Sequence, residues 1–141
     1  MREIDLQQQV ADYIRLQYPN VIFHSDFSSG IKLTMGQAIK QKRLNGGRRS
    51  WPDMFLAETV IVERKDGIYE GLSGLFVELK RESTRIFKKD GKLVADEHIR
   101  EQFDMLHDLR ARGYAAEFAC GLDEAKKLID DYMKGRYAHV D

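Results

Sequence analysis

The feature that most constrains the fold is a long helical pattern between two short apolar runs in the second half of the chain. The runs 75–80 and 114–119 are rich in apolar residues and have the length of strands. Between them, residues 97–112 carry apolar side chains at helical spacing, with Asp96 as a candidate N-cap and Gly113 as the C-terminal glycine. A helix between two strands predicts a parallel crossover. We therefore expect an α/β fold with a mixed central β-sheet flanked by helices.

The other patterns complete the expected order of elements. Residues 3–17 are predicted to form a helix that ends at Pro19, and residues 122–134 are predicted to form the last helix. Strands are predicted at 21–24 and at 53–62, the second with an irregularity near its middle. The expected order is α-β-β-β-α-β-α. A chain of 141 residues with this order is expected to be a single domain.

A basic segment at about 25–51 precedes the second predicted strand. The chain is neutral overall, with 23 basic and 23 acidic residues, so its total charge gives no indication about nucleic acid. The segment is predicted to be a loop, or a loop that contains a short helix ended by Gly46. It is either a solvated loop or a surface that contacts phosphates, and its lack of acids favours phosphate contact. The charged residues from 31 to 52 are all positive: Lys32, Lys40, Lys42, Arg43, Arg48 and Arg49.

The sequence lacks the marks of export and of membrane insertion. Cys120 is the only cysteine, so no internal disulfide can form, which is typical of a reducing compartment. No apolar run approaches the ~18 residues of a transmembrane helix. The first ten residues lack the apolar centre of a signal peptide. The expected location is therefore the cytoplasm, with no membrane partner.

Two charged residues, Glu78 and Lys80, lie near the end of the strong strand predicted at 75–80. Side chains alternate along a strand, so both share the face opposite to the leucine and valine side chains that are expected to form the core. Charges in such a place are costly unless they are paired or bind a metal. If the strand that starts at Asp53 lies alongside, Asp53 and Glu78 converge and favour a hard cation such as Mg²⁺. With a lysine to orient or deprotonate water and a basic segment nearby, this chemistry indicates phosphodiester hydrolysis.

These residues resemble a known nuclease motif. Pro52-Asp53 followed by Glu78-Leu79-Lys80 looks like the PD…(D/E)XK motif of restriction-endonuclease-like enzymes, and the wider pattern is similar to the VRR-NUC branch of that superfamily. The short motifs are weak alone, and their order on predicted strands makes the likeness more specific. The resemblance spans nearly the whole chain. Its features are Glu3, SWPDMFLA, GLFVELK, Gln102 and LRARGYAAEFACGLDEAKKLI.

The resemblance implies a restriction-endonuclease-like core that cleaves DNA with Mg²⁺, for which Mn²⁺ can substitute. It implies that Asp53, Glu78 and the backbone carbonyl of Leu79 bind the metal and that Lys80 is the catalytic lysine. Stand-alone members of this size are similar to phage or prophage enzymes. Those enzymes act as homodimers on branched DNA, such as Holliday junctions or flaps.

Two further residues, Gln102 and Glu3, are candidate supporting groups of the catalytic site. Gln102 borders the buried stripe of the helix 97–112, and an amide that points toward the core needs a polar partner. Glu3 lies on the inward stripe of the first helix, one turn before Gln7. The resemblance implies that both border the site. Taken alone, Gln102 is an ordinary helix-edge residue and Glu3 a favourable charge in a first helical turn.

Two alternative functions stay open from the sequence. One is a non-catalytic DNA-binding module that retains the nuclease fold, and the other is a protein-interaction domain whose charged strand face docks a partner. The presence of Asp53, Glu78 and Lys80 favours the enzyme. The insert 58–74 is long for a tight hairpin, so the pairing of the two motif strands is also open.

Overall fold

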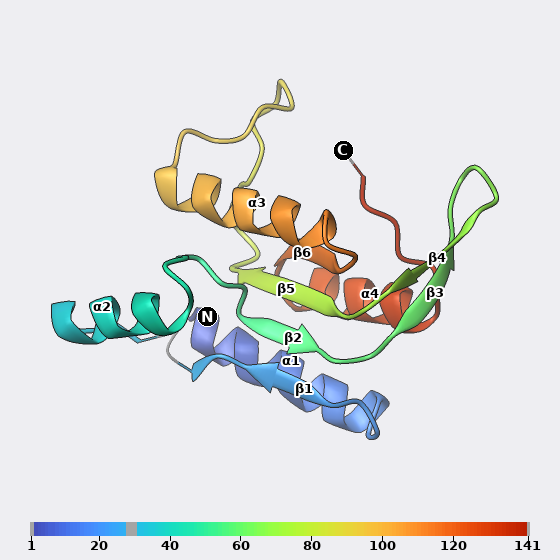
Figure 1. The fold of residues 1–141 in the computed structure, drawn as a ribbon, viewed down its shortest axis with the longest axis horizontal. Helices are drawn as coiled ribbons and strands as arrows, with labels where there is room; N and C mark the ends of the chain where they lie inside the picture. Colours follow the sequence, from blue (N-terminus) through green and yellow to red (C-terminus); the bar gives the residue numbers. More distant parts are fainter. Residues whose placement is uncertain (1, 28–30, 141) are drawn as a thin grey trace.

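The computed structural model describes residues 2–27 and 31–140 and contains a mixed four-stranded sheet. The strands lie in the order β1-β2-β5-β6 (Figure 1). The β1–β2 and β2–β5 pairs are antiparallel, and the β5–β6 pair is parallel, so the predicted α/β class is confirmed. Their bounds are Phe23–Ser25 for β1, Met54–Leu56 for β2, Leu75–Lys80 for β5 and Ala115–Cys120 for β6.

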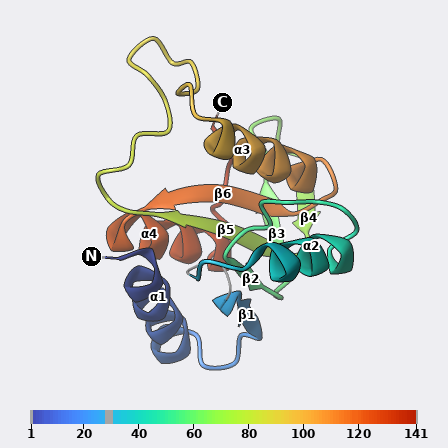
Figure 2. The same ribbon diagram turned by 90° about the vertical axis from the view of Figure 1, so that its left-hand side faces the viewer.

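Helices cover both faces of this sheet. α1 (Glu3–Gln17) and α4 (Leu122–Met133) lie on one face and α3 (Glu97–Arg110) on the other (Figures 1 and 2). Alternate side chains of β5, including Leu75 and Val77, belong to the larger core on the α1/α4 side, as the alternation predicted. No helix within residues 2–27 and 31–140 combines the length and the apolar character needed to cross a membrane.

Local sequence signals set the crossover from β5 to β6. The Asp96 side chain accepts a hydrogen bond from the Ile99 N–H at 3.1 Å, which satisfies one of the free amides at the start of α3. Gly113 adopts φ 92° between α3 and β6, a backbone conformation that favours glycine. The predicted helix at 3–17 is likewise observed over the same residues.

The single strand predicted at 53–62 is wrong, because the chain forms two strands there in two different sheets. β2 belongs to the main sheet, whereas β3 (Val60–Glu63) pairs with β4 (Tyr69–Leu72), a strand that the sequence did not predict. Over the described residues, the observed order therefore contains two more strands and one more helix than the expected one. The insert 58–74 leaves the main sheet as a separate ribbon, so β2 and β5 pair directly.

The additional helix lies in the basic segment. α2 (Met35–Leu44) starts with a capping box. The Thr34 hydroxyl accepts a hydrogen bond from the Gln37 N–H at 3.2 Å, and the Gln37 side chain accepts one from the Thr34 N–H at 3.0 Å. Gly46, with φ 67°, follows the helix, as expected for a short helix ended there. Residues 28–30 of the basic segment lie outside the described residues.

Close packing before β5 predicts an effect of substitution at Gly74. A Cβ atom at Gly74 would overlap the Phe55 ring and lie 2.9 Å from the Leu56 carbonyl oxygen. We expect Gly74→Ala to lower the free energy of unfolding by about 1–3 kcal/mol, the usual cost of overpacking. Gly71→Ala in β4 is the matched control, because a Cβ there meets nothing within 4 Å. Equal stability of the two variants in urea unfolding would contradict this packing.

Candidate active site

The register of β2 and β5 positions two of the predicted metal ligands. Met54 pairs with Val77, so the next residues along the two antiparallel strands, Asp53 and Glu78, are opposite each other. The Asp53 carboxylate accepts a hydrogen bond from the Leu79 N–H at 2.7 Å. The structure therefore brings Asp53, Glu78 and the backbone of Leu79 together where β2 starts (Figure 1).

Glu78 is a buried carboxylate with one oxygen bound by the protein. The residue is 4% exposed, and its Oε1 accepts a hydrogen bond from Gln102 Nε2 on α3 at 2.5 Å. Its Oε2 has no hydrogen-bond partner within the described residues. His98 also lies here, with its Nε2 3.2 Å from Gln102 Nε2. The side chains of His98, Gln102 and Glu78 thus lie in one continuous polar chain.

The side chains around Glu78 share one electrostatic environment. Burial raises the pKa of Glu78 well above its ordinary value, because the charged form loses its hydration. The Asp53 carboxylate raises this pKa further by repulsion, the Lys80 ammonium lowers it, and the Glu3 carboxylate on α1 again raises it. Lys80 is itself buried at the end of β5. Asp53, Lys80 and Glu3, the other three charged candidate residues, therefore all act electrostatically on Glu78 in the folded chain.

The donor set fits a divalent cation that takes few protein ligands. Within residues 2–27 and 31–140, no group of three or more His, Cys, Asp or Glu side chains could hold a metal ion. The two carboxylates of Asp53 and Glu78, one with a buried oxygen that lacks a donor, are a smaller set. Mg²⁺ typically takes one or two protein carboxylates and keeps several waters, and Mn²⁺ also prefers oxygen ligands. The residues present thus fit either ion.

Gln7 is a positioning residue that was not selected from the sequence. It is buried on α1, and its Nε2 donates to the Asp26 carbonyl at 2.9 Å and lies 3.5 Å from the Asp53 carbonyl oxygen. The Asp26 N–H donates to the same Asp53 carbonyl at 2.8 Å. A polar side chain on the buried stripe of a helix was the available signal, because such a group needs a partner.

The predicted phosphate-contacting residues differ in their surroundings. Arg48 donates to the Asp108 carboxylate on α3 at 3.0 Å, so it is ion-paired. Ser50, with φ 63°, donates from its hydroxyl to Glu101 on the same helix at 3.2 Å. These two contacts tether the end of the basic segment to α3. The other five basic residues lie at the surface, Lys32, Lys40, Lys42, Arg43 and Arg49.

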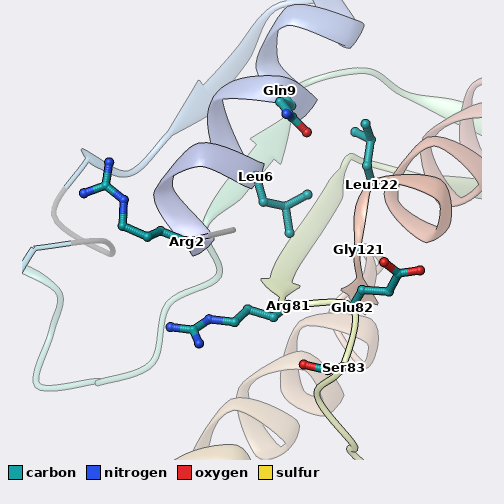
Figure 3. A pocket seen from close by; sticks show the side chains of 8 residues that line it. All are labelled: Arg2, Leu6, Gln9, Arg81, Glu82, Ser83, Gly121 and Leu122. Carbon is teal, nitrogen blue, oxygen red and sulfur yellow. The ribbon is translucent and has the colours of Figure 1, made fainter.

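An open pocket of about 590 Å³ lies beside the end of β5. It is lined by the first turns of α1 and α4 and by the residues that follow Lys80 (Figure 3). The side chains of Arg2 and Arg81 extend to the same side in that view, whereas Glu82 lies on the other side. The pocket therefore adds two guanidinium groups close to the end of the strand that carries Glu78 and Lys80.

Comparison with known proteins addresses the fold. No protein-family model matches the sequence, and no curated protein sequence matches it. Among solved structures, the chain is similar to one described as a VRR_NUC domain protein, at 19% identity and a TM-score of 0.64. The match covers 99% of this chain and 98% of that chain. The chain has the fold of that VRR_NUC domain protein. The resemblance predicted from Pro52-Asp53 and Glu78-Leu79-Lys80 is thus confirmed at the level of the fold.

The raised pKa of Glu78 predicts how stability depends on pH without metal. An acid with a higher pKa in the folded state stabilises the fold fully below its unfolded-state pKa, and this contribution is lost as the pH rises through the folded-state value. In EDTA, we expect the free energy of unfolding of the wild type to fall, relative to that of Glu78→Gln, as the pH rises above 4.5, the ordinary glutamate value. Urea titrations from pH ~4.5 to ~8 measure this difference. Parallel curves for the two proteins would show that Glu78 ionises as an ordinary glutamate.

Proposed function

We propose that the chain is a metal-dependent DNA endonuclease that hydrolyses phosphodiester bonds and prefers branched DNA, such as Holliday junctions or flaps. The observation that carries the proposal is the buried Glu78 oxygen without a donor, beside Asp53 and Lys80 in a VRR-NUC fold. Two carboxylates close together repel each other. Two carboxylates and a lysine at one end of a sheet therefore favour the binding of a cation and a phosphate. Mg²⁺ is the proposed cofactor, and Mn²⁺ is expected to substitute.

The chain's own residues supply the ligands and hold them in place. Asp53, Glu78 and the backbone carbonyl of Leu79 would hold the ion. When bound, Mg²⁺ would supply positive charge to the scissile phosphate and balance the two carboxylates. Gln102 keeps Glu78 in one orientation by its hydrogen bond to Oε1, which leaves Oε2 for the ion. Glu3 would border the site from α1 and add negative charge to it.

Lys80 is the proposed catalytic lysine. Lys80 is 7% exposed, and its ammonium acts on Glu78 by lowering the pKa of that carboxyl. In this position, Lys80 Nζ would orient the attacking water and stabilise the negative charge that develops on the phosphate. The attraction between Lys80 and Glu78 also helps to keep Glu78 ionised, which a metal ligand requires.

The basic segment is the proposed surface for the DNA backbone. Lys32, Lys40, Lys42, Arg43 and Arg49 lie at the surface, and Arg48 keeps the segment close to α3 through Asp108. Lysine and arginine side chains of this kind bind phosphates without reading sequence. A homodimer is proposed as well, because two identical sites related by a two-fold axis match the symmetry of a four-way junction.

Substitution of the site residues tests the catalytic proposal. We expect Lys80→Ala and Asp53→Asn each to lower Mg²⁺-dependent cleavage of a labelled junction by about 100-fold or more, because each removes a group that acts on the reacting phosphate or water. Lys65→Ala is the matched control, since Lys65 is an exposed lysine in the β3–β4 turn. Undiminished cleavage by both site variants would rule out this site. DNA binding without cleavage in Mg²⁺ or Mn²⁺ would instead indicate a non-catalytic binding module.

The role of the basic segment is tested by the salt dependence of binding. We expect the triple variant Lys40→Ala, Lys42→Ala, Arg43→Ala to bind a junction more weakly in EDTA. The slope of log K against log salt should become less steep by roughly 0.9 for each phosphate that the variant no longer neutralises. Fluorescence anisotropy at several salt concentrations measures the slope, with Lys65→Ala as the control. A slope equal to that of the wild type would mean that these residues form only a solvated surface.

A further inference from the structure

α2 is a helix that projects from the molecule without being buried in it. None of its ten residues, all of them within the described chain, is buried. Met35 is 82% exposed and Ile39 63% exposed. Helices shorter than about 12 residues are marginally stable in water unless tertiary packing supports them, and exposed apolar side chains gain stability when they are covered. These properties indicate that the helix binds a partner.

Two of the exposed apolar side chains, Met35 and Ile39, are on the side of α2 that faces away from the protein. Gln41 is the one residue of α2 that is not fully exposed, so its side of the helix faces the body of the protein. At about 100° per residue, Ile39 and Arg43 lie about 160° around the helix from Gln41. Met35 is one turn before Ile39 on the same side. We call Met35, Ile39 and Arg43 the outer stripe of α2.

The positive charges of residues 31–52 favour a polyanion as the partner of α2. The outer stripe ends in Arg43, next to Lys42, and residues 31–52 contain no acid. A symmetric contact between two copies of α2 would bring together two basic segments that contain no acid, which is unfavourable. Phosphates alone offer no apolar surface to Met35 and Ile39, whereas DNA bases do where stacking is interrupted. Proteins commonly insert such apolar side chains between unstacked bases.

We propose that the outer stripe of α2 recognises the branch point of the DNA, with Met35 and Ile39 packed against bases that are unstacked there and Arg43 on the adjacent phosphate. α2 projects from the end of the sheet at which β2 starts and β5 ends, so it would contact the same DNA as the candidate site (Figures 1 and 2). The inference rests on the proposed function. It adds to that function the element that distinguishes branched from linear DNA.

The double variant Met35→Ser, Ile39→Ser tests this inference. Leu44→Ser is its matched control, since Leu44 is 75% exposed on α2 but only about 60° around the helix from Gln41, on the inner side. We expect the double variant to lower the ratio of branched to linear cleavage in Mg²⁺ by roughly tenfold, because the serine side chains would no longer bury apolar surface against the unstacked bases. Cleavage of linear duplex and the thermal midpoint should not change, and Leu44→Ser should behave as the wild type.

A DNA-binding measurement in EDTA, where no cleavage occurs, tests the same contact of Met35 and Ile39 with the bases. With 2-aminopurine at the branch point, binding of the wild type and of Leu44→Ser should change the fluorescence, whereas the double variant should bind with a much smaller change. A cleavage ratio and a fluorescence change equal to those of the wild type would overturn the inference. A lower molar mass of the double variant in light scattering would also overturn it, because the stripe would then join two copies.

The test separates this inference from the proposed function. If the wild type neither binds nor cuts any DNA, the proposed function fails and the inference fails with it. If the wild type cuts branched DNA and the double variant cuts it with the same selectivity, only the inference fails. Binding of the wild type to anionic lipid vesicles that is abolished in the double variant would assign the stripe to a membrane surface and would likewise overturn it.

Discussion

The hydrogen bond from the Leu79 N–H to the Asp53 carboxylate links the register of the sheet to the chemistry of the candidate site. Asp53 comes just before β2, and its side chain accepts the bond at 2.7 Å. An ionised acceptor makes this bond stronger than one between neutral groups. A shift of one residue in the β2–β5 register would turn every β2 side chain to the other face and separate Asp53 from Glu78. The same bond thus favours one register and orients one proposed ligand.

Glu78 shows how the fold can hold an unfavourably buried polar group. A buried polar group that is left without a partner costs about 1–3 kcal/mol, and Glu78 Oε2 is such an atom within the described residues. The strand that carries it is nevertheless firmly held, because Leu75, Val77 and Leu79 on its other face belong to the larger core. Alternation along β5 therefore divides one strand into an apolar face that supplies stability and a polar face that supplies the site.

The sequence predicted those elements whose causes are local. The Asp96 cap and Gly113 set the ends of α3 and its turn to β6, and both are close to the residues that they affect. The break between β2 and β3 has a distant cause, because the Tyr132 hydroxyl on α4 donates to the Glu58 carbonyl between the two strands. Residues 57–59 contain neither glycine nor proline, so the sequence indicated only an irregularity near the middle of the strand predicted at 53–62 and not a change from one sheet to another.

The same distinction applies to the candidate site. The motif residues Asp53, Glu78 and Lys80 could be identified from residue type and order, and the contact from Gln102 to Glu78 agrees with the need of an inward-pointing amide for a partner. The position of Gln7 on a buried helical stripe indicated that it needs a partner, but the sequence could not identify that partner. Its partner is the backbone of Asp26, which is placed next to Asp53 only by the pairing of β1 with β2. A backbone partner leaves no side-chain pattern in the sequence.

The neutral total charge is compatible with a site that binds a polyanion. Six of the 23 basic residues lie in residues 31–52, so the rest of the chain holds 17 bases against 23 acids. In solution at physiological salt, charges act over a Debye length of about 8 Å. A phosphate near Asp53 therefore responds to the cations at that end of the sheet, such as Arg81 after β5, and hardly to acids at the far end. In the proposed function, Asp53 and Glu78 would repel a phosphate until a cation balanced them, so attraction to DNA would come from these local bases and the proposed metal and not from the sum over the chain.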